Sequence, residues 1–330
     1  MRGFFSNETK EMMENDKILD TNREPIPNIP GYLFVKVLGK GSNGVVIKSK
    51  NEKTNEKVAI KMLRASNQDD KEINDRFRRE LKILSRMSHP YIVKIDKVEE
   101  EGRPYIVMEY LKYSLKDLLY DKKIKFTKID ALKVVKKIAK ALEYAHSNGI
   151  IHRDVKPANI LFRKNGTPVL ADFGLVNSIE SNSDLKTDLT STYSGLGTPA
   201  YRSPELWKNQ KDNTLTDIYS LGVLLFELLS GKLPYNGQTF LELMIQHTQP
   251  TTPKLPNNLK AYQPLIDKMM AKDRRHRINA TETRVLIEKY ISGEMQIEFK
   301  KKQKNKWLTY FLIATIAVFL ILIILMFFLI

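Results

Sequence analysis

Two short segments near the middle of the chain carry side chains suited to proton transfer and metal binding. They read His152-Arg153-Asp154-Val155-Lys156-Pro157-Ala158-Asn159 and Ala171-Asp172-Phe173-Gly174. The carboxylate of Asp154 can accept or orient the proton of a hydroxyl group. Asn159 and Asp172 offer oxygen ligands of the kind that Mg²⁺ takes while it keeps water and phosphate oxygens in its other positions. Together the segments predict a site that acts on a hydroxyl group and a metal-bound phosphate.

A glycine-rich turn lies upstream of these segments. It reads Gly39-Lys40-Gly41-Ser42-Asn43-Gly44-Val45-Val46. Glycine lets the backbone approach a phosphate closely and adopt a positive φ. The GxGxxG spacing alone is weak evidence, because dinucleotide-binding folds and ordinary hairpins also carry it. Here a strand is expected on both sides of the turn, which excludes the dinucleotide-binding fold and predicts a β-hairpin lid over the phosphates of ATP.

A lysine and a glutamate are expected to complete the phosphate site. Lys61 ends the run Val58-Ala59-Ile60-Lys61, which is typical of a strand. Glu80 falls among Phe77, Leu81 and Leu84 on the apolar face of a predicted helix. A carboxylate on such a face needs a cation, because its desolvation is otherwise costly. We therefore predict a Lys61–Glu80 ion pair that holds the lysine against the α- and β-phosphates.

The elements that position these residues change in character along the chain. Strand patterns are predicted at 32–38, 45–50, 57–63, 92–98 and 105–110, with one helix at about 69–87. After Ser114 the periodicity is helical, with an amphipathic helix around 131–145 and a helix that is apolar nearly all round at 218–229. The order predicts an α+β fold, with a small antiparallel β lobe that carries one helix and a larger, mainly α lobe.

The C-terminal segment has the composition of a membrane span. Residues 308–330 contain no charge, Gly or Pro, and as a helix they would reach roughly 34 Å, against roughly 30 Å of hydrocarbon. Trp307 and Tyr310 are placed for an interfacial aromatic belt. Lysines 300, 301, 302, 304 and 306 precede the segment, so the positive-inside bias predicts that the large domain is cytosolic. A buried core helix and a cleaved lipid-anchor signal are the alternatives.

Composition narrows the remaining classes of function. The 330 residues include no cysteine, which excludes disulfides and Cys-ligated metals. The net charge of +16 allows nucleic acid, an anionic membrane surface or acidic substrates as partners. Outside the run before the apolar segment, the lysines are spread along the chain, so nucleic acid is not expected as a partner.

From about residue 32 to 291 the chain resembles the protein kinase superfamily, specifically the Hanks-type Ser/Thr kinases of bacteria. The resemblance implies a bilobal kinase fold that binds ATP and Mg²⁺ and acts on protein Ser/Thr hydroxyls. It implies a Lys61–Glu80 pair, Asp154 as catalytic base, Lys156 at the γ-phosphate, Thr198 in contact with Asp154 and Lys156, and Asn159 and Asp172 as metal ligands. The nucleotide site it implies is formed by Leu38, Gly39, Lys40, Gly41, Ser42, Asn43, Gly44, Val46, Ala59, Lys61, Met108 (the gatekeeper), Glu109, Leu111 and Leu161.

The same resemblance implies supporting contacts. Glu205 would pair with Arg277, and Asp217 would hold the catalytic loop by its backbone. Leu84, Ile95, His152 and Phe173 would stack as a spine. Arg153 would belong to a basic pocket for a phosphorylated residue of the activation loop, and we expect autophosphorylation within 187–194, with Thr190 and Thr192 favoured. Departures from the family pattern are Asn43, Val155 and Ser203, and only Asn43 puts the ATP fit in doubt.

The predicted organisation has four parts. Residues 1–28 form an N-terminal extension, 29–292 the kinase domain (small lobe 29–109, large lobe 114–292), 293–306 a basic linker and 307–330 a transmembrane helix. The lipid bilayer and protein substrates are the expected partners. A homodimer through the small lobe or the span is a further option, although the span lacks a GxxxG motif. The rival functions are a catalytically inactive membrane scaffold and a basic nucleic-acid-binding protein.

Overall fold

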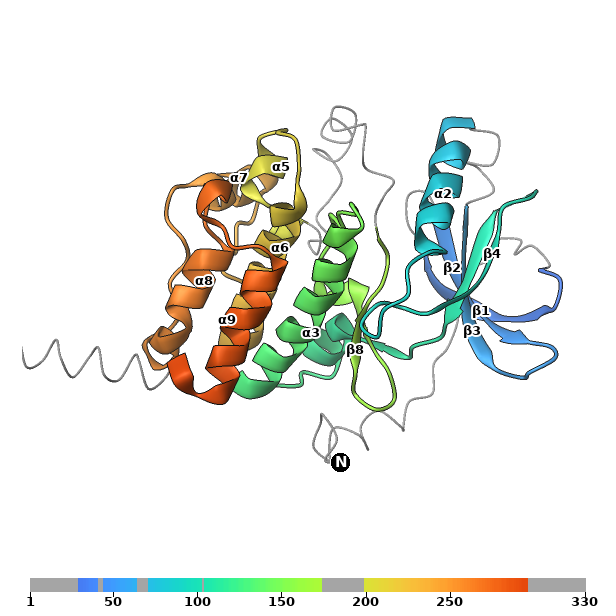
Figure 1. Ribbon diagram of the computed structural model, residues 1–330, viewed down its shortest axis with the longest axis horizontal. Coiled ribbons are helices and arrows are strands. Elements are labelled where there is room, and N and C mark those ends of the chain that lie inside the picture. The colour runs from blue at the N-terminus through green and yellow to red at the C-terminus, as the bar shows by residue number, and fades with distance from the viewer. Residues whose placement is uncertain (1–28, 41–43, 64–70, 103, 174–198, 296–330) are drawn as a thin grey trace, which may run out of the picture.

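The computed structural model describes residues 29–40, 44–63, 71–102, 104–173 and 199–295. They form a small β-rich lobe and a larger helical lobe, which lie at opposite ends of the molecule in Figure 1. The catalytic segments predicted from the sequence lie between the two.

The small lobe is a twisted antiparallel sheet. Its strands are β1 (Tyr32–Lys40), β2 (Gly44–Asn51), β3 (Lys57–Leu63), β4 (Ile95–Glu99) and β5 (Tyr105–Glu109), in the order β1-β2-β3-β5-β4. Because side chains alternate along a strand, Val45, Ile47, Val58 and Ile60 are buried on one face. Ala59 and Lys61 therefore share the other face, opposite Met108 and Ile106 of β5.

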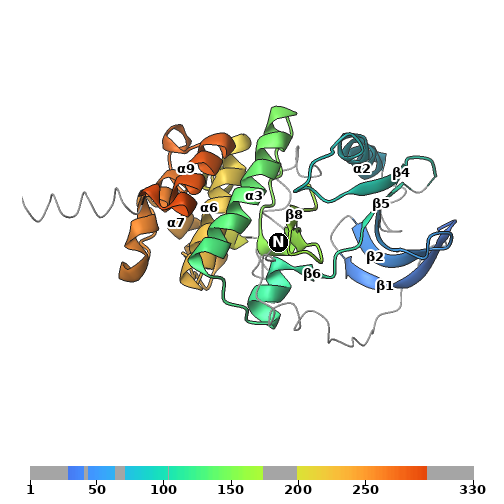
Figure 2. The ribbon, with the colours of Figure 1, turned by 60° about the horizontal axis from the view of Figure 1, so that its bottom comes forward.

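One helix covers part of this sheet. Helix α2 (Lys71–Leu84) buries Phe77, Leu81 and Leu84, the i, i+4, i+7 spacing of one helix face. They belong to the same core cluster as Leu63 and Ile106 of the sheet. In both views α2 lies against the sheet near β4 (Figures 1 and 2).

The large lobe is mainly helical. Its elements are a short sheet of β6 (Tyr113–Ser114), β7 (Ile160–Phe162) and β8 (Pro168–Leu170), the helices α3 (Lys128–Ser147), α5 (Pro204–Trp207), α6 (Thr214–Ser230), α7 (Phe240–Thr248), α8 (Gln263–Met269) and α9 (Ala280–Ser292), a π-helical turn at Asp117–Asp121, and 3₁₀ turns at Pro157–Asn159, Pro199–Tyr201, Asn257–Tyr262 and Arg274–His276. Helix α6 is buried from Thr216 to Leu228, as the nearly all-apolar sequence of 218–229 predicts.

Capping residues explain where α6 begins and ends. The side chain of Asn213 accepts a hydrogen bond from the backbone of Leu215, and Thr216 bonds back to the backbone of Asn213. At the other end Gly231 has φ +73°, a conformation that costs glycine little. The first turn of α6, which carries Asp217, is thereby fixed in place.

Two boundary predictions need correction. A strand was predicted from residue 92, but β4 begins at Ile95, because Ile92 and Val93 pair with Leu170 of β8 instead. The helix predicted to reach residue 87 ends at Leu84 in a turn. Within the described part of the chain no helix is long and apolar enough to cross a bilayer, and the predicted span at 307–330 lies outside that part.

A buried ion pair ties α5 to the end of the large lobe. The guanidinium of Arg277 donates to both carboxylate oxygens of Glu205, at 2.7 and 3.1 Å, which confirms the predicted pair. Burial alone would raise the pKa of Glu205, but the hydrogen bonds and charge of Arg277 hold that pKa below its usual range. Thr216 also donates to the carboxylate, so the buried charge is well solvated by the protein.

We expect the substitution Arg277→Met to lower the free energy of unfolding by about 3–5 kcal/mol, because it leaves the buried carboxylate of Glu205 without a cation. Chemical denaturation measures this loss. The double variant Arg277→Met/Glu205→Leu removes both charges and should recover a large part of it. An equal loss in the single and double variants would show that packing, rather than an unpaired charge, is responsible.

Candidate active site

Three polar side chains converge in the segment between α3 and β7. The ammonium Nζ of Lys156 lies 2.7 Å from Oδ2 of Asp154. The amide nitrogen of Asn159 donates to the same Oδ2 at 2.9 Å and to the Asp154 carbonyl at 2.8 Å. The carboxylate of Asp154 is therefore held by two donors from its own loop, and its orientation does not depend on a ligand.

The loop itself is anchored by Asp217 of α6. This carboxylate is fully buried and accepts the backbone N–H groups of His152, at 2.9 Å, and Arg153, at 2.7 Å. Its Oδ2 also lies 2.8 Å from Nε2 of His146. Arg153 has φ +68°, a left-handed conformation that disfavours non-glycine residues. The anchoring of the loop by Asp217, expected from the sequence, is confirmed.

A charge pair joins the two lobes. Nζ of Lys61, on β3, lies 2.7 Å from Oδ1 of Asp172, which follows β8. The charge of Lys61 lowers the pKa of Asp172, so this carboxylate is ionised at neutral pH. Glu80 lies on α2, but its side chain is outside the described part of the structure, so the predicted Lys61–Glu80 pair stays a prediction.

His152 connects the loop to the segment of Asp172. Its ring lies 4.6 Å from the ring of Phe173, centroid to centroid. Its Nε2 lies 3.0 Å from the carbonyl of Ala171 and its Nδ1 accepts the N–H of Asp154 at 3.2 Å. One ring nitrogen thus faces an acceptor and the other a donor, which suits the neutral imidazole. Leu84 and Phe173 share one core cluster, and Ile95 packs against it, an arrangement compatible with the predicted spine.

The predicted nucleotide residues within the described part of the chain lie on β1, β2, β3, β5 and β7 or directly beside these strands. The sheet register places Val46 opposite Lys61 and Ala59 opposite Met108. Leu38, Gly39 and Lys40 end β1, Leu111 follows β5, and Leu161 lies on β7. At Gly44 a Cβ would lie 3.1 Å from the carbonyl oxygen of Met62, so the close approach of β3 explains the glycine. Gly41, Ser42 and Asn43 lie outside the described residues, as does Thr198.

The oxygen atoms that Asn159 and Asp172 offer suit a magnesium ion whose other ligands come from a nucleotide and water. Among the residues that the structure describes, no three His, Cys, Asp or Glu side chains gather as in a metal centre made by protein alone. Asp172 offers a carboxylate that is half exposed. Because the amide nitrogen of Asn159 is bonded to Asp154, its oxygen is the atom left for a metal. One carboxylate and one amide oxygen suit Mg²⁺, which completes its shell with water and phosphate.

Comparison with known proteins agrees with this geometry. The family model described as "Protein kinase domain" matches residues 32–290. The chain belongs to the protein kinase family. Its kinase domain is similar to the serine/threonine-protein kinase PrkC of Bacillus subtilis, with 36% identity over 257 residues, 76% of this chain and 39% of the relative.

Two further relatives give the same result. The probable serine/threonine-protein kinases PknB of Lactococcus lactis and of Bifidobacterium longum are each 32% identical, over 76% and 81% of this chain and 40% of each relative. The chain thus spans about two fifths of the length of these curated relatives.

Some contacts of the kinase domain were not anticipated from its sequence. The guanidinium of Arg153, predicted to bind a phosphorylated residue, is paired with Asp212. The activation loop from 174 to 198 lies outside the described residues, so its predicted phosphorylation sites do too. The carboxylate of Glu109, a residue of the predicted nucleotide site, is bonded to Arg163.

A second unanticipated cluster lies beside the turn that follows Thr198. The hydroxyl groups of Tyr120 and Tyr201 both donate to the buried carboxylate of Glu227, the latter at 2.5 Å. Burial raises the pKa of Glu227, while the two tyrosine hydrogen bonds oppose that rise. The cluster joins the π-helical turn, the 3₁₀ turn at Pro199–Tyr201 and α6, so it fixes the 3₁₀ turn against α6.

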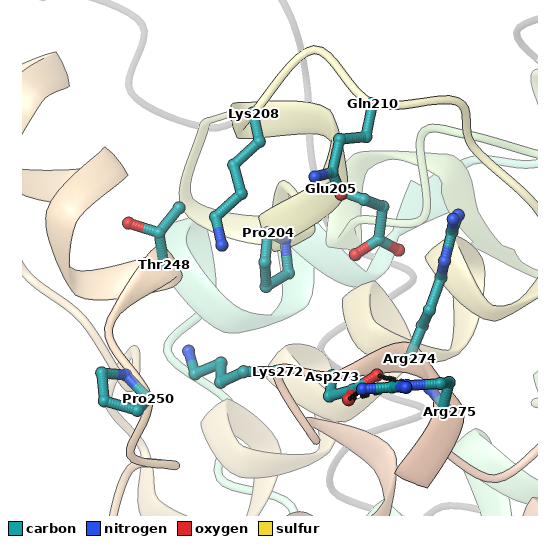
Figure 3. A pocket seen from close by; sticks show the side chains of 10 residues that line it. All are labelled: Pro204, Glu205, Lys208, Gln210, Thr248, Pro250, Lys272, Asp273, Arg274 and Arg275. Atoms are coloured by element: carbon teal, nitrogen blue, oxygen red, sulfur yellow. Dashed lines mark hydrogen bonds and ion pairs between the residues drawn. The ribbon is translucent and has the colours of Figure 1, made fainter.

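A cavity of about 490 Å³ lies elsewhere, beside the Glu205–Arg277 pair. Figure 3 shows its lining from α5, the end of α7 and the loop after α8. It includes Lys208, Lys272, Arg274 and Arg275, and Asp273 is paired with Arg275. None of the residues predicted for catalysis or nucleotide binding lines it, so the catalytic cluster and this cavity are separate features.

The anchoring role of Asp217 predicts a large effect of its removal. We expect Asp217→Ala to lower the free energy of unfolding by about 3 kcal/mol, because two buried N–H groups lose their acceptor. Denaturant titration measures the change. Asp267→Ala is the matched control, since Asp267 also accepts two side-chain hydrogen bonds but is 41% exposed. Equal losses in the two variants would contradict the anchoring role.

Proposed function

We propose that this chain is a Ser/Thr protein kinase that uses ATP and Mg²⁺ to phosphorylate hydroxyl groups of proteins. The observation that carries the proposal is that Asp154, Lys156 and Asn159 lie together next to the segment of Asp172, which pairs with Lys61 of the small lobe. The carbonyl of Asn159 accepts the N–H of Ala171 at 2.9 Å and so joins the two segments. Relatives named as serine/threonine-protein kinases support the choice of substrate. Lys156 two positions after Asp154 favours Ser/Thr over Tyr.

Each residue of the site has its own role in phosphotransfer. A protein hydroxyl oxygen forms a bond to the γ-phosphorus as the bond to the bridging oxygen breaks, and ADP leaves. Asp154 orients the hydroxyl and takes its proton. Lys156, already beside Asp154, balances the charge that develops on the transferred group. When bound, Mg²⁺ would be held by Asn159 and Asp172 and would neutralise phosphate charge.

The existing ion pairs prepare the site for its charged ligands. Both carboxylates already have a lysine partner, Asp154 with Lys156 and Asp172 with Lys61. Before binding, each carboxylate is therefore neutralised by a lysine. With nucleotide and Mg²⁺ bound, Lys61 would turn to phosphate and Asp172 to the metal, so no bare charge has to be stabilised in either state.

The proposal includes location and regulation. We infer that 307–330 anchors the chain in a membrane with the kinase domain on the cytosolic side, on the basis of the apolar segment and the lysines before it. We also infer that the kinase phosphorylates its own activation loop within 187–194, where hydroxyl residues gather. We further infer that this reaction takes place between two copies of the chain, which makes a second copy its partner.

Phosphotransfer tests the enzyme directly. The full chain in detergent, with Mg²⁺, γ-labelled ATP and a basic protein substrate, should label Ser and Thr. Asp154→Asn should lower the rate by about 10²–10⁴-fold, because the substrate proton loses its acceptor. Asp267→Asn, distant from the site in sequence, is the control and should retain activity. ATP binding without transfer would support the membrane scaffold, and labelled tyrosine would contradict Ser/Thr specificity.

Membrane attachment has its own test. After expression, the chain should stay with the membrane fraction through high-salt and alkaline washes. The variant Ile316→Arg/Leu320→Arg should be released, because each arginine at the centre of a span costs about 2.5–3.5 kcal/mol. Substitution of Lys301 and Lys304 by Gln is the control and should leave the chain membrane-bound. Release of the unsubstituted chain by salt alone would refute the span.

A further inference from the structure

Arg163 makes a fork-shaped contact with the segment that joins the two lobes. It directly follows β7, and its Nε and Nη2 donate to Oε2 and Oε1 of Glu109 at 2.9 and 2.6 Å. Glu109 is the last residue of β5. Two parallel hydrogen bonds of this kind restrain orientation as well as distance.

The same guanidinium holds a third segment. Its Nη1 donates to the carbonyl of Pro90 at 2.7 Å and its Nη2 to that of Ile92 at 3.3 Å. These residues lie between α2 and β4. The carboxylate of Glu109 in turn accepts the N–H of Lys94 at 2.8 Å. One arginine thus connects the end of β5, the segment before β4 and the β7–β8 hairpin.

The three connected segments border the predicted nucleotide site. Met108 precedes Glu109, and Leu111 follows it by two residues. Leu161 of β7 lies two residues before Arg163, and the hairpin leads on to Asp172. Since Leu170 of β8 also bonds to Tyr91 and Val93, the hairpin and the segment before β4 form one unit. A change in the angle between lobes would have to break the Arg163–Glu109 contact or move this unit.

Burial separates this pair from an ordinary surface ion pair. The side chains of Arg163 and Glu109 are only 27% and 21% exposed. The hydrogen bonds to Glu109 also raise the pKa of Arg163 above its ordinary value. Exposed single pairs contribute little to stability. Here one side chain donates five hydrogen bonds to three residues, so its loss releases several backbone positions at once.

We propose that Arg163 is a positioning residue for nucleotide binding, which fixes the segment around Glu109 against the β7–β8 hairpin. Arg163 acts through this segment and does not itself touch the nucleotide. By holding Met108 and Leu111 at a set distance from Leu161, it keeps the adenine side of the site at the width that the base requires. The inference rests on the proposed kinase function.

The test is the affinity of the full chain for Mg²⁺–ADP, measured by calorimetry. We expect Arg163→Met to raise the Kd about tenfold, the equivalent of one lost hydrogen bond of typical strength. The matched control is Arg284→Met. Arg284 donates to Glu143 at 2.9 Å, with side chains 25% and 31% exposed, and joins α9 to α3. This control should leave the Kd unchanged although it loses a comparable ion pair.

Further variants separate positioning from general stability. Arg163→Lys keeps the charge but not the fork, so its Kd should fall between those of the wild type and Arg163→Met. Glu109→Gln should resemble Arg163→Met, and the double variant should add little to either, because both changes remove one contact. The KM for the protein substrate should stay constant in Arg163→Met while the KM for ATP rises.

Two results would overturn the inference while leaving the kinase function intact. One is an unchanged Kd for ADP in Arg163→Met. The other is a lower Kd, which would mean that the pair restrains the site from binding nucleotide. Failure of the unsubstituted chain to bind ADP would instead contradict the proposed kinase function, and with it this inference.

Discussion

The carboxylate of Asp217 holds two consecutive backbone N–H groups of the segment that carries Asp154. One of them belongs to Arg153, whose positive φ costs about 1–3 kcal/mol and persists only when its surroundings fix it. Asp217 can do this because it lies in the first turn of α6, where a negative charge is favoured by the helix dipole. The caps and apolar packing that fix α6 therefore also fix the catalytic loop, because Asp217 of α6 bonds to its backbone.

Charge pairs also connect the large lobe to the small one. Asp154 is held by Lys156 and Asn159, and Asp172 reaches across to Lys61. The Arg163–Glu109 contact connects the lobes on the predicted adenine side, while the Lys61–Asp172 contact does so on the predicted phosphate side. The site is thus restrained from two sides by groups that also determine the relative position of the lobes.

Much of this arrangement could be predicted from the sequence, because runs typical of strands located β2, β3 and β5 and the nearly all-apolar helix of 218–229 located α6. The resemblance to protein kinases predicted the Glu205–Arg277 pair and the contacts of Asp217 with the catalytic loop. The pairs Arg163–Glu109, Arg153–Asp212 and Tyr120–Glu227 were missed, since their partners are 54, 59 and 107 residues apart and no local sequence pattern links them. The start of β4 was misplaced because pairing of Ile92 and Val93 with β8 is a tertiary effect.

The most direct test of this account is hydrogen exchange at the backbone amides of His152 and Arg153, resolved by NMR in the full chain. If Asp217 anchors the loop, both amides should exchange as slowly as those in the middle of α6, because they open only with the core of the large lobe. Rapid exchange at His152 and Arg153 while α6 stays protected would show that the loop opens independently. That result would contradict the central role given to the carboxylate of Asp217.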